Sequence, residues 1–595
     1  MFAKVLIANR GEIAVRIARA CEELGIATVA VYSELDRDAL HVRRADEAYL
    51  LGPGPASESY LNIEKLLEVI EKSGAEAVHP GYGFLAENAA FAKALEEHGT
   101  VFIGPPASAI EAMGSKTRAR ELMKRAGVPI VPGTTEPVET IEDAHRVIAE
   151  TIGYPVAVKA AGGGGGKGFR VALTEDKLQD AFEGAAREGE KFFGDATVYL
   201  ERYLPDPRHV EVQVLADSHG NVIHLGERDC SLQRRHQKLI EEAPAPAVDE
   251  DLRQKIGRIA TEAAAAVNYT GAGTIEGLLQ GGEYFFLEMN TRVQVEHCVT
   301  EMVTGIDIVK EGIKVAAGAP LSITQEDVVL RGHAIECRIN AENAARNFAP
   351  APGVIGAYRE PTGPGVRVDS GVGPGSEITP MYDPMVAKLI VWDADREQAT
   401  ARMLRALGEY EIGTLTTLIP FHQAILATEQ WANAETCRDL IEDRRWLKSL
   451  AAPPADGAVA DAAGEEAVEQ TYTVEVSGKR FDVKVIGPPP VVGAAINGSG
   501  PAAAAGRRPP RRSQRGAGGG GGGDTLSSPL QGTVLKVAVE AGAEVQEGAL
   551  IAVIEAMKME NEITAHKAGT VTELPIAVGA AVATGDTLAV ISAGV

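Results

Sequence analysis

A run of small and charged residues late in the chain divides the sequence into parts that must fold separately. Residues 501–523 read PAAAAGRRPPRRSQRGAGGGGGG, without an acidic or a large apolar residue. Such a segment cannot bury enough apolar surface to offset the entropy lost on ordering, so we expect a flexible tether. We interpret its arginines as the solvated face of a spacer, and a patch for nucleic acid or a partner protein is the alternative.

Just before the tether, residues 471–486 (TYTVEVSGKRFDVKVI) alternate apolar and polar side chains on both sides of Ser477-Gly478. This pattern predicts two short strands joined in a hairpin. The preceding residues 453–469 are rich in Ala, Gly and Asp. We therefore assign residues 447–523 to a linker that contains one short β segment, residues 470–487.

Residues 524–595 contain an internal repeat. At an offset of 37 residues, Gly532-Thr533-Val534 falls on Gly569-Thr570-Val571. Two similar sets of short strands and glycine turns predict a small β-sandwich with pseudo-twofold symmetry. Lys558 lies midway between the two halves, where the chain must turn back, so we expect it at an exposed hairpin tip. An ordinary exposed lysine is the alternative.

Upstream of about residue 450, strand-like runs alternate with amphipathic helical runs, which is typical of α/β proteins. Val5–Ala8 predicts a buried strand, a helical run follows to Glu23, and Ala27–Tyr32 predicts the next strand. This is a βαβ unit of Rossmann type, although it lacks the GxGxxG of dinucleotide-binding folds. The length of 595 residues suggests about four domains.

Charge and cysteine content exclude several classes of protein. Acidic residues outnumber basic ones by 83 to 58, a net charge of −25, which argues against a general binder of nucleic acid or anionic membranes. Any anionic substrate must meet a local group of cations or backbone N–H groups. The five cysteines form no CxxC pair, which fits neither a disulfide framework nor a zinc site. Because no run of about 18 apolar residues occurs, we expect a cytoplasmic protein without a membrane segment.

A strand that opens into consecutive glycines is a candidate phosphate-binding loop. Residues 156–168 read VAVKAAGGGGGKG. The glycines allow backbone N–H groups to close on phosphate oxygens, while Lys159 and Lys167 add positive charge. The loop is not a Walker A motif, because no Ser or Thr follows the GK pair. A bare flexible loop is the alternative.

Two carboxylates and an amide form a candidate metal site. Glu288 and Asn290 are two residues apart on the apolar run 284–290 (YFFLEMN), so both side chains point to one face, and Glu276 lies on a neighbouring short strand. Such hard oxygen ligands suit Mg²⁺ or Mn²⁺ bridging nucleotide phosphates. A solvated strand face is the alternative, but the glycine loop favours the metal interpretation.

A polar run, residues 291–297 (TRVQVEH), follows directly. Arg292 could hold an oxyanion, and Glu296 could act as a base beside it. Residues 234–238 (RRHQK) form a second local cationic group, for which a surface charge run is the more ordinary interpretation.

Seven motifs occur in one order along the chain: KVLIANRGEIAVRI (4–17), HPGYGFLAEN (79–88), MGSK (113–116), KAAGGGGGKG (159–168), RDCSLQRRHQK (228–238), FFLEMNTRVQVEH (285–297) and EAMKME (555–560). With them, residues 1 to about 446 closely resemble the biotin carboxylase component of biotin-dependent carboxylases, an ATP-grasp enzyme. Residues 524–595 resemble a biotin carboxyl carrier domain. The whole chain resembles the α subunit of an acetyl-/propionyl-CoA carboxylase in which carboxylase and carrier are fused.

The resemblance implies an α/β fold in several parts. These are a pre-ATP-grasp Rossmann-like domain (1–115), an ATP-grasp domain (116–330), a C-terminal biotin carboxylase domain (331–446) and an all-β flattened barrel-sandwich of the biotinyl/lipoyl type (524–595). It also implies the activity, which is the ATP-dependent carboxylation of protein-linked biotin with bicarbonate through carboxyphosphate. The implied cofactors are biotin attached to Lys558, ATP, and Mg²⁺ or Mn²⁺.

The family's site residues carry over to matching positions of this chain. The resemblance implies that ATP is bound by Lys116, Lys159, Gly165, Gly166, Glu201, Arg202, Tyr203, Leu204, His209, Gln233, His236 and Leu278, together with Glu276 and Glu288. It implies that the metal is bound by Glu276, Glu288 and Asn290. Bicarbonate is assigned to Lys238, Arg292, Gln294, Val295 and Glu296, with Glu296 as the general base. Biotin is assigned to Tyr82 and Arg338, and the catalytic set is Lys238, Arg292, Glu296 and Arg338.

Three positions depart from the family pattern. Cys298 stands where proline is usual after the Glu-His pair, Gly277 where an aromatic residue is common, and Arg202 where lysine is frequent. None of these changes removes a catalytic group.

The resemblance further implies partners. We expect a separate carboxyltransferase (β) subunit, because 595 residues leave no room for that domain. We also expect a biotin protein ligase and a homo-oligomer within a larger αβ holoenzyme of fatty-acid and related metabolism, with no nucleic-acid or membrane partner. Two alternatives stay open: the α subunit of a methylcrotonyl-CoA or pyruvate carboxylase, and a non-catalytic biotin carrier or scaffold. The complete set of site residues argues against the second.

Overall fold

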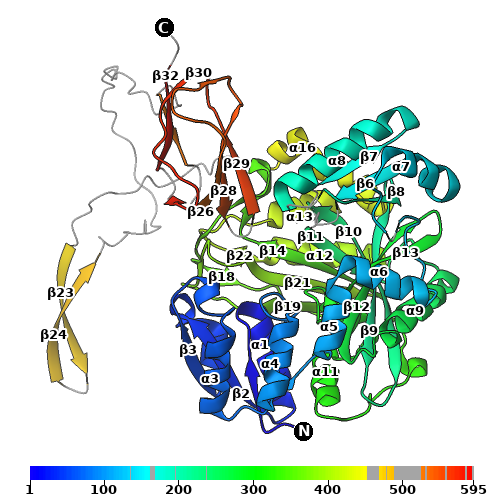
Figure 1. The fold of residues 1–595 in the computed structure, drawn as a ribbon. Helices are drawn as coiled ribbons and strands as arrows, with labels where there is room; N and C mark the ends of the chain where they lie inside the picture. Colours follow the sequence, from blue (N-terminus) through cyan, green and yellow to red (C-terminus); the bar gives the residue numbers. More distant parts are fainter. Residues whose placement is uncertain are drawn as a thin grey trace, which may run out of the picture. The chain divides into compact units, whose positions relative to one another are not determined.

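The computed structural model of the chain (Figure 1) describes residues 1–134, 136–160, 168–193, 196–235, 237–451, 468–476, 479–487, 524–528, 532–556, 559–582 and 586–592. Up to residue 450 it consists of three larger sheets and the helices that pack on them, and from residue 525 it is all-β. The α/β class and the all-β C-terminal region predicted from the sequence are confirmed.

The first hundred residues form a parallel sheet with the strand order β3-β2-β1-β4-β5. The predicted βαβ unit is present as β1 (Lys4–Ile7), α1 (Gly11–Glu23) and β2 (Ala27–Ser33). The remaining strands are β3 (Glu47–Gly52), β4 (Ala77–His79) and β5 (Val101–Phe102). The carboxyl ends of these parallel strands lie on one edge of the sheet, where His79 and its neighbours contribute to the site described below.

Local sequence sets the limits of the helices on this sheet. α3 (Ile63–Ser73) begins after Asn62, whose side chain accepts a backbone N–H of the first turn. It ends at Gly74, with φ = 68°, a conformation that glycine adopts without strain. α4 (Ala89–His98) is bounded in the same way by an asparagine and a glycine.

A small antiparallel sheet follows, with the strand order β7-β6-β8. Its strands are β6 (Val156–Ala160), β7 (Phe169–Ala172) and β8 (Val198–Arg202). The apolar face of α8 (Leu178–Phe193) packs on β6 and β7, so that Leu178 and Ala185 join the buried cluster with Val156 and Val158. The residues between β6 and β7 include the glycine run, and residues 161–167 lie outside the described part.

The largest sheet has eight antiparallel strands in the order β13-β12-β9-β10-β11-β14-β21-β19. Its strands are β9 (Arg208–Ala216), β10 (Val222–Arg234), β11 (Gln237–Ala243), β12 (Gly271–Gln280), β13 (Glu283–Asn290), β14 (His333–Asn340), β19 (Val366–Ser370) and β21 (Met385–Asp393). The sheet crosses the predicted domain boundary between residues 330 and 331, because β11 on one side of it pairs with β14 on the other. Side chains from both predicted domains therefore share one continuous surface.

Helices cover this sheet and complete residues 1–450. α9 (Glu250–Ala265) packs on β9 and β10, α10 (His297–Thr304) on β14 and β21, and α12 (Arg396–Glu409) on β21. The other helices are α2 (Leu40–Arg44), α5 (Ala107–Gly114), α6 (Lys116–Arg125), α7 (Ile141–Val147), α11 (Ile308–Ala316), α13 (Ile419–Leu426), α14 (Glu429–Ala432), α15 (Arg438–Glu442) and α16 (Arg444–Ser449). The short strands are β15 (Glu342–Asn343), β16 (Ala349–Pro350), β17 (Gly353–Val354), β18 (Tyr358–Arg359), β20 (Glu377–Ile378) and β22 (Glu411–Ile412).

The C-terminal region reproduces the sequence repeat strand by strand. The first half holds β25 (Thr525–Ser527), β26 (Gly532–Val537), β27 (Glu544–Val545) and β28 (Leu550–Ala556), and the second half holds β29 (Met559–Thr564), β30 (Gly569–Glu573), β31 (Ala581–Val582) and β32 (Thr587–Ser592). The halves exchange strands between two sheets, β25-β32-β30-β27 and β29-β28-β26-β31. Gly542 and Gly579, at equivalent repeat positions, both have positive φ, which explains the repeated glycine turn. The predicted two-sheet sandwich is confirmed.

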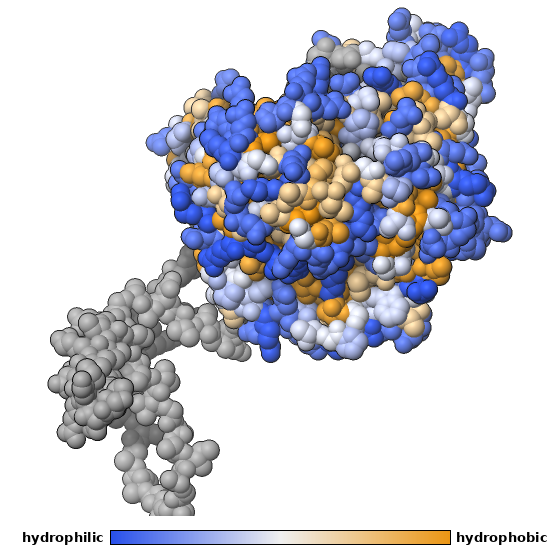
Figure 2. Space-filling model, turned by 90° about the horizontal axis from the view of Figure 1, so that it is seen from below, coloured by the Kyte–Doolittle hydropathy of each residue, from blue (hydrophilic) through white to orange (hydrophobic). Residues whose placement is uncertain are grey.

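The predicted hairpin of the linker is present as β23 (Val468–Val476) and β24 (Lys479–Gly487), which pair antiparallel with Val476 opposite Lys479. No helix of the described residues is long and apolar enough to cross a membrane. On the face shown in Figure 2, apolar residues form several patches separated by hydrophilic ones.

Candidate active site

A row of charged side chains crosses the largest sheet. In the register of its strands, Glu288 (β13) lies opposite Glu276 (β12), Glu276 lies opposite Glu211 (β9), and Glu211 lies opposite Arg228 (β10). Directly opposed residues of an antiparallel sheet point to the same face. Three adjacent carboxylates repel one another, so the row requires nearby cations.

Lys238 on β11 supplies one of these cations. Its Nζ lies 2.5 Å from Oε2 of Glu211, 2.9 Å from Oε1 of Glu276 and 2.5 Å from Oε1 of Glu296. Burial alone would lower the pKa of Lys238, but the three carboxylates outweigh burial and hold the pKa well above its ordinary value. Lys238 is therefore a fully charged ammonium at the centre of the site.

Glu296 lies between two cations at the start of α10. Besides the Lys238 contact at Oε1, its Oε2 accepts from Nη2 of Arg338 at 2.9 Å, while Nε of Arg338 donates to Glu241 at 2.6 Å. Burial raises the pKa of Glu296, but Lys238, Arg338 and Arg228 outweigh it and hold the pKa well below the ordinary value. The carboxylate is ionised at neutral pH, which is the form that can accept a proton.

Arg228 is the second cation behind the row, and its side chain is completely buried. Its Nε donates to Oε1 of Glu211 at 2.7 Å, and its Nη2 donates to Oε1 of Gln294 at 2.6 Å. Gln294 in turn donates through Nε2 to Oε1 of Glu276 at 2.7 Å. A buried arginine with carboxylate and amide partners is pre-organised, so it fixes Gln294 relative to the carboxylate row.

Two of the three predicted metal ligands, Glu276 and Asn290, contact each other. Nδ2 of Asn290 donates to Oε1 of Glu276 at 2.8 Å, and Nε2 of His209 lies 2.8 Å from Oε2 of Glu276. Burial raises the pKa of Glu276, whereas Lys238 and His209 outweigh burial and lower it. Glu288 lies opposite Glu276 in the strand register, so the three predicted ligands lie on two adjacent strands. Their carboxylate and amide oxygens are of the hard type that suits a divalent cation.

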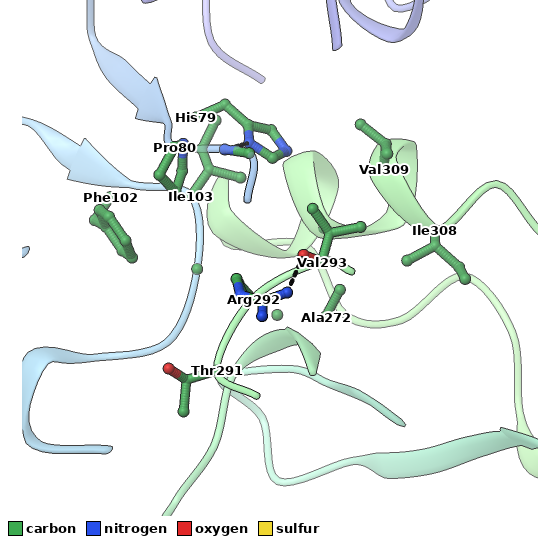
Figure 3. Close-up of a pocket in the computed structure, with 14 residues that line it drawn as sticks. His79, Pro80, Phe102, Ile103, Ala272, Thr291, Arg292, Val293, Ile308 and Val309 are labelled. Atoms are coloured by element: carbon green, nitrogen blue, oxygen red, sulfur yellow. Dashed lines mark hydrogen bonds between the residues drawn. The ribbon is translucent and has the colours of Figure 1, made fainter. Parts of the chain in front are cut away.

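Arg292 lies in the loop that follows β13. Its Nη2 donates to Oδ1 of Asn290 at 2.7 Å, and its Nε lies 3.1 Å from Oε2 of Glu87. Figure 3 shows Arg292 and Val293 beside a small pocket, with His79 and Ile103 from the parallel sheet on one side. Within the described part of the chain, Arg292 alone among the predicted site residues lines this pocket. The bond to Asn290 connects Arg292 to one of the predicted metal ligands.

The predicted nucleotide-binding residues divide between two sheets. Lys159 (β6) forms an ion pair with Glu201 (β8), and Glu201 also lies 2.7 Å from Nη1 of Arg120. Next to Glu201, the predicted set continues along the chain with Arg202, Tyr203 and Leu204. Arg202 lies 3.8 Å from Glu283. This part of the site is built on the small sheet.

The remaining predicted nucleotide residues lie on or near the largest sheet. His209 is paired with Leu278, and Gln233 with Lys238. Lys116 begins α6. Gly165, Gly166, His236 and Lys558 lie outside the described residues.

The predicted biotin residues, Tyr82 and Arg338, both contact buried carboxylates. The hydroxyl of Tyr82 donates to Oε1 of Glu12, and Arg338 contacts Glu296 as above. The backbone carbonyl of Val295 accepts from Nζ of Lys388 at 2.9 Å. Strands β28 and β29, which flank the predicted biotin-attachment position, pair with Ala556 opposite Met559.

Two departures from the family pattern have a structural explanation. An added Cβ at Gly277 would overlap the ring of Tyr284, a diagonal neighbour across the β12–β13 pair, so a tyrosine from the adjacent strand covers this glycine. The thiol of Cys298 donates to Oδ2 of Asp369 at 3.2 Å and lies 3.1 Å from Nζ of Lys388. The broader cation of Arg202 reaches the β13 strand through Glu283.

Sequence reasoning missed Glu211, Arg228 and Glu241. Glu211 carried a usable signal, because it alternates with Val210 and Val212 in the same way that Glu288 alternates with apolar residues. Arg228 and Glu241 carried none, since their importance arises from cross-strand neighbours that are distant in sequence.

Family profiles match nearly the whole carboxylase-like region and the C-terminal region. The N-terminal domain of biotin carboxylase matches residues 1–110, the ATP-binding domain of the carbamoyl-phosphate synthase L chain 115–324, and the C-terminal domain of biotin carboxylase 336–443. A Bacillus subtilis protein named biotin carboxylase 1 is 57% identical over 437 residues, 73% of this chain and 97% of the relative. The chain belongs to the biotin carboxylase family.

The carboxylase region is joined to a carrier. Residues 524–591 match the profile of biotin-requiring enzymes. A Mycobacterium leprae protein named biotin-dependent acyl-coenzyme A carboxylase alpha3 subunit is 46% identical over 572 residues, 95% of each chain. A pyruvate carboxylase subunit from Methanothermobacter thermautotrophicus is 55% identical over 445 residues, 75% of this chain and 90% of the relative.

A solved structure supports the fold and the cofactors. The biotin carboxylase domain dimer of Hydrogenobacter thermophilus 2-oxoglutarate carboxylase, in complex with MgADP, ADP and bicarbonate, matches with a TM-score of 0.69 at 49% identity, covering 75% of this chain and 99% of that one. This chain is therefore a biotin carboxylase fused to a biotin carrier domain. It catalyses ATP-dependent carboxylation of biotin and uses biotin, ATP and Mg²⁺.

Proposed function

We propose that this chain is the α subunit of an acyl-CoA carboxylase, and that it supplies the carboxylated carrier to a separate carboxyltransferase subunit whose substrate is acetyl-CoA or propionyl-CoA. The observation that carries the proposal is the match to the Mycobacterium leprae α3 subunit over 95% of both chains, carrier included. The Bacillus and Methanothermobacter relatives match over only 73% and 75% of this chain.

A pyruvate carboxylase subunit is the second candidate, favoured by the 55% identity to the Methanothermobacter protein within the carboxylase region. That region performs the same half-reaction whichever acceptor follows. Sequence identity within the carboxylase region therefore does not discriminate between acceptors. The share of the chain that a relative covers is the stronger argument.

For the carboxylase half-reaction we assign bicarbonate to Lys238, Arg292, Gln294 and Val295, with Glu296 as the base. Glu296 is ionised but strongly stabilised by Lys238 and Arg338, which makes it a weak base in the free enzyme. An anion bound beside Lys238 competes with Glu296 for the Lys238 ammonium and adds negative charge next to the Glu296 carboxylate. Both effects raise the pKa of Glu296, so the bound anion makes it a stronger base.

We assign the nucleotide to the small sheet and to the adjoining strands of the large sheet, through Lys116, Lys159, Gly165, Gly166, Glu201, Arg202, Tyr203, Leu204, His209, Gln233, His236 and Leu278. Glu276, Glu288 and Asn290 would hold the divalent cation, which when bound withdraws charge from the phosphate oxygens. The ion pair between Lys159 and Glu201 orients the lysine on β6, next to the glycine run. Of the residues assigned to the nucleotide and to bicarbonate, His209 and Lys238 contact Glu276 in the carboxylate row directly.

We assign biotin to Lys558 for attachment, and to Tyr82 and Arg338 for recognition in the site. Arg338 is held by Glu241 and Glu296, so its remaining donors can stabilise negative charge on the ureido oxygen. Domain limits of 1–115, 116–330, 331–446 and 524–595 are part of the same proposal. Its partners are a biotin protein ligase and the carboxyltransferase subunit, in a cytoplasmic holoenzyme that contains several copies of this chain.

Copurification followed by acceptor assays tests the proposal. The full chain is isolated with its native partner proteins and supplied with ATP, Mg²⁺ and labelled bicarbonate. Label transferred to acetyl-CoA or propionyl-CoA, at least ~10-fold faster than to methylcrotonyl-CoA or pyruvate, is the expected result. Preferential labelling of pyruvate or methylcrotonyl-CoA would replace the acyl-CoA assignment with the corresponding alternative.

A further inference from the structure

Lys388 on β21 is a completely buried lysine to which the mechanism above assigns no role. It lies directly opposite Arg338 on β14 in the sheet register, and opposite Asp369 on β19. Two cations placed opposite one another, one completely buried and one largely buried, are costly. The arrangement is maintained by carboxylates, since Arg338 contacts Glu241 and Glu296 while Lys388 contacts a different pair.

Lys388 contacts both the backbone next to Glu296 and the carboxylate that binds Tyr82. Its Nζ lies 3.2 Å from Oε1 of Glu12 and 3.6 Å from Oδ2 of Asp369, and it donates to the carbonyl of Val295 at 2.9 Å. Val295 immediately precedes Glu296. The same oxygen of Glu12 accepts the hydroxyl hydrogen of Tyr82, and the ammonium lies 5.9 Å from the centre of the Tyr82 ring.

We propose that Lys388 is a positioning residue for the carboxylation step, fixing the Val295–Glu296 turn through the Val295 carbonyl and the Tyr82 hydroxyl through Glu12. Lys388 touches no assigned substrate group itself. The inference rests on the roles given above to Glu296 and Tyr82. It adds that a single buried ammonium fixes the position of Glu296, assigned to bicarbonate, relative to Tyr82, assigned to biotin.

The first of the two contacts is the hydrogen bond from Nζ of Lys388 to the backbone carbonyl of Val295. A backbone carbonyl bound to a charged donor is held more tightly than one bound to a neutral donor. Glu296 has no freedom of its own to compensate, because it is the residue that precedes α10 and its two oxygens face Lys238 and Arg338. Loss of the Lys388 ammonium therefore displaces the main chain that carries the bicarbonate-binding residues.

The second contact of Lys388 is the ion pair with Glu12, which in turn accepts a hydrogen bond from Tyr82. Burial raises the pKa of Glu12, Lys388 lowers it, and the balance leaves it at about 7. Its carboxylate accepts from the phenol and the ammonium at one oxygen, so the direction of the Tyr82 hydroxyl depends on where Lys388 holds Glu12. In this chain Cys298 adds a further contact, 3.1 Å from the ammonium, at the position where the family usually has proline.

Four variants test these two contacts separately. They are made in the full chain carrying Lys558→Ala, with free biotin as the acceptor. Lys388→Met removes the charge and the donors at nearly constant volume. Glu12→Gln keeps an acceptor for Tyr82 but removes one of the two carboxylates that Lys388 contacts. The double variant removes both charges of the buried pair, so it stays folded if Lys388→Met alone does not. Lys388→Arg is the conservative variant.

We expect Lys388→Met and the double variant to raise the KM for bicarbonate by about 10-fold or more, while the KM for ATP changes by less than about twofold. Glu12→Gln alone is expected to raise the KM for free biotin and to leave the KM for bicarbonate unchanged. Lys388→Arg restores the KM for bicarbonate in part. A residue that only stabilised the fold would lower the active fraction without separating the three KM values.

An active parent chain whose folded Lys388 variants keep the parental KM for bicarbonate overturns the inference and leaves the proposed function standing. A folded parent chain without bicarbonate-dependent ATP hydrolysis overturns the proposed function, and the inference with it.

Discussion

Nζ of Lys238 lies 2.5 Å from Oε1 of Glu296, and neither side chain is more than 10% exposed. Lys238 therefore keeps the Glu296 carboxylate ionised and fixed in position, and Nη2 of Arg338 donates to its other oxygen. Lys238 also contacts Glu211 and Glu276, so it connects the proposed base to Glu276, the carboxylate that we assign to the metal and the nucleotide. An anionic substrate that draws Lys238 toward itself changes the environment of all three carboxylates at once.

Glu296→Gln should abolish turnover while sparing the fold. Lys238 retains Glu211 and Glu276, and Arg338 retains Glu241, so no buried cation loses its last partner. We expect bicarbonate-dependent ATP hydrolysis to fall by about 10²–10⁴-fold and ATP affinity, measured by calorimetry, to stay near the parental value. Glu111→Gln on α5 is the matched surface control. Parental turnover in Glu296→Gln would remove Glu296 as the base.

Lys558→Arg should prevent attachment of biotin. Arginine keeps the positive charge but offers a guanidinium in place of the primary amine that forms the amide bond. We expect no signal for this variant on a streptavidin blot after expression with a biotin protein ligase, while the parental chain and Lys567→Arg, a control in the same region, are labelled. A labelled Lys558→Arg chain would contradict the assignment.

Glu301 should give the carboxylase region part of its acid sensitivity. Burial raises the pKa of Glu301, but His297, Arg16 and Arg367 outweigh burial and lower it to about 2. A depressed carboxyl pKa stabilises the fold above the unfolded value near 4.5, and that stability is lost as the pH falls from about 4.5 to 2. It corresponds to roughly 3 kcal/mol at pH 7.

Glu301→Gln tests this contribution. The denaturant midpoint of the variant should lie well below the parental one at pH 7, and the two should approach each other below pH 4.5. A difference that stays constant from pH 7 to pH 3.5 would show that Glu301 contributes through packing and not through its charge.

A pair of glycine substitutions should have opposite effects on stability. Gly312 lies in α11, and no atom lies within 4 Å of an added Cβ. Gly312→Ala is expected to raise the free energy of unfolding by about 0.5–1 kcal/mol, because alanine loses less backbone entropy in a helix. Gly277→Ala places its Cβ against the Tyr284 ring and should lower stability by about 1–3 kcal/mol. Thermal unfolding of both variants measures the difference, and equal signs would contradict the packing described here.

Local patterns predicted the parts of this molecule that depend on strand period and turn chemistry. Glu288 and Asn290 alternate on one strand, so their common face follows from the period of two, and the repeated glycines of the carrier marked turns at Gly542 and Gly579. The contacts of Lys388 could not be predicted in this way. Glu12, Val295 and Asp369 come from three parts of the chain far apart in sequence. The pairing of β19 with β21 and the packing of α1 on β19 and of α10 on β21 bring them to one lysine.

We infer that this chain carboxylates the biotin on its own carrier, and a labelling experiment can show this reaction. The biotinylated full chain is incubated with ATP, Mg²⁺ and ¹⁴C-bicarbonate, separated from free label and treated with acid or avidin. We predict acid-labile label on the parental chain that requires ATP and is blocked by avidin, and none on Glu296→Gln or Lys558→Arg. A biotinylated parental chain that takes up no label, or label that persists in Lys558→Arg, would contradict the account.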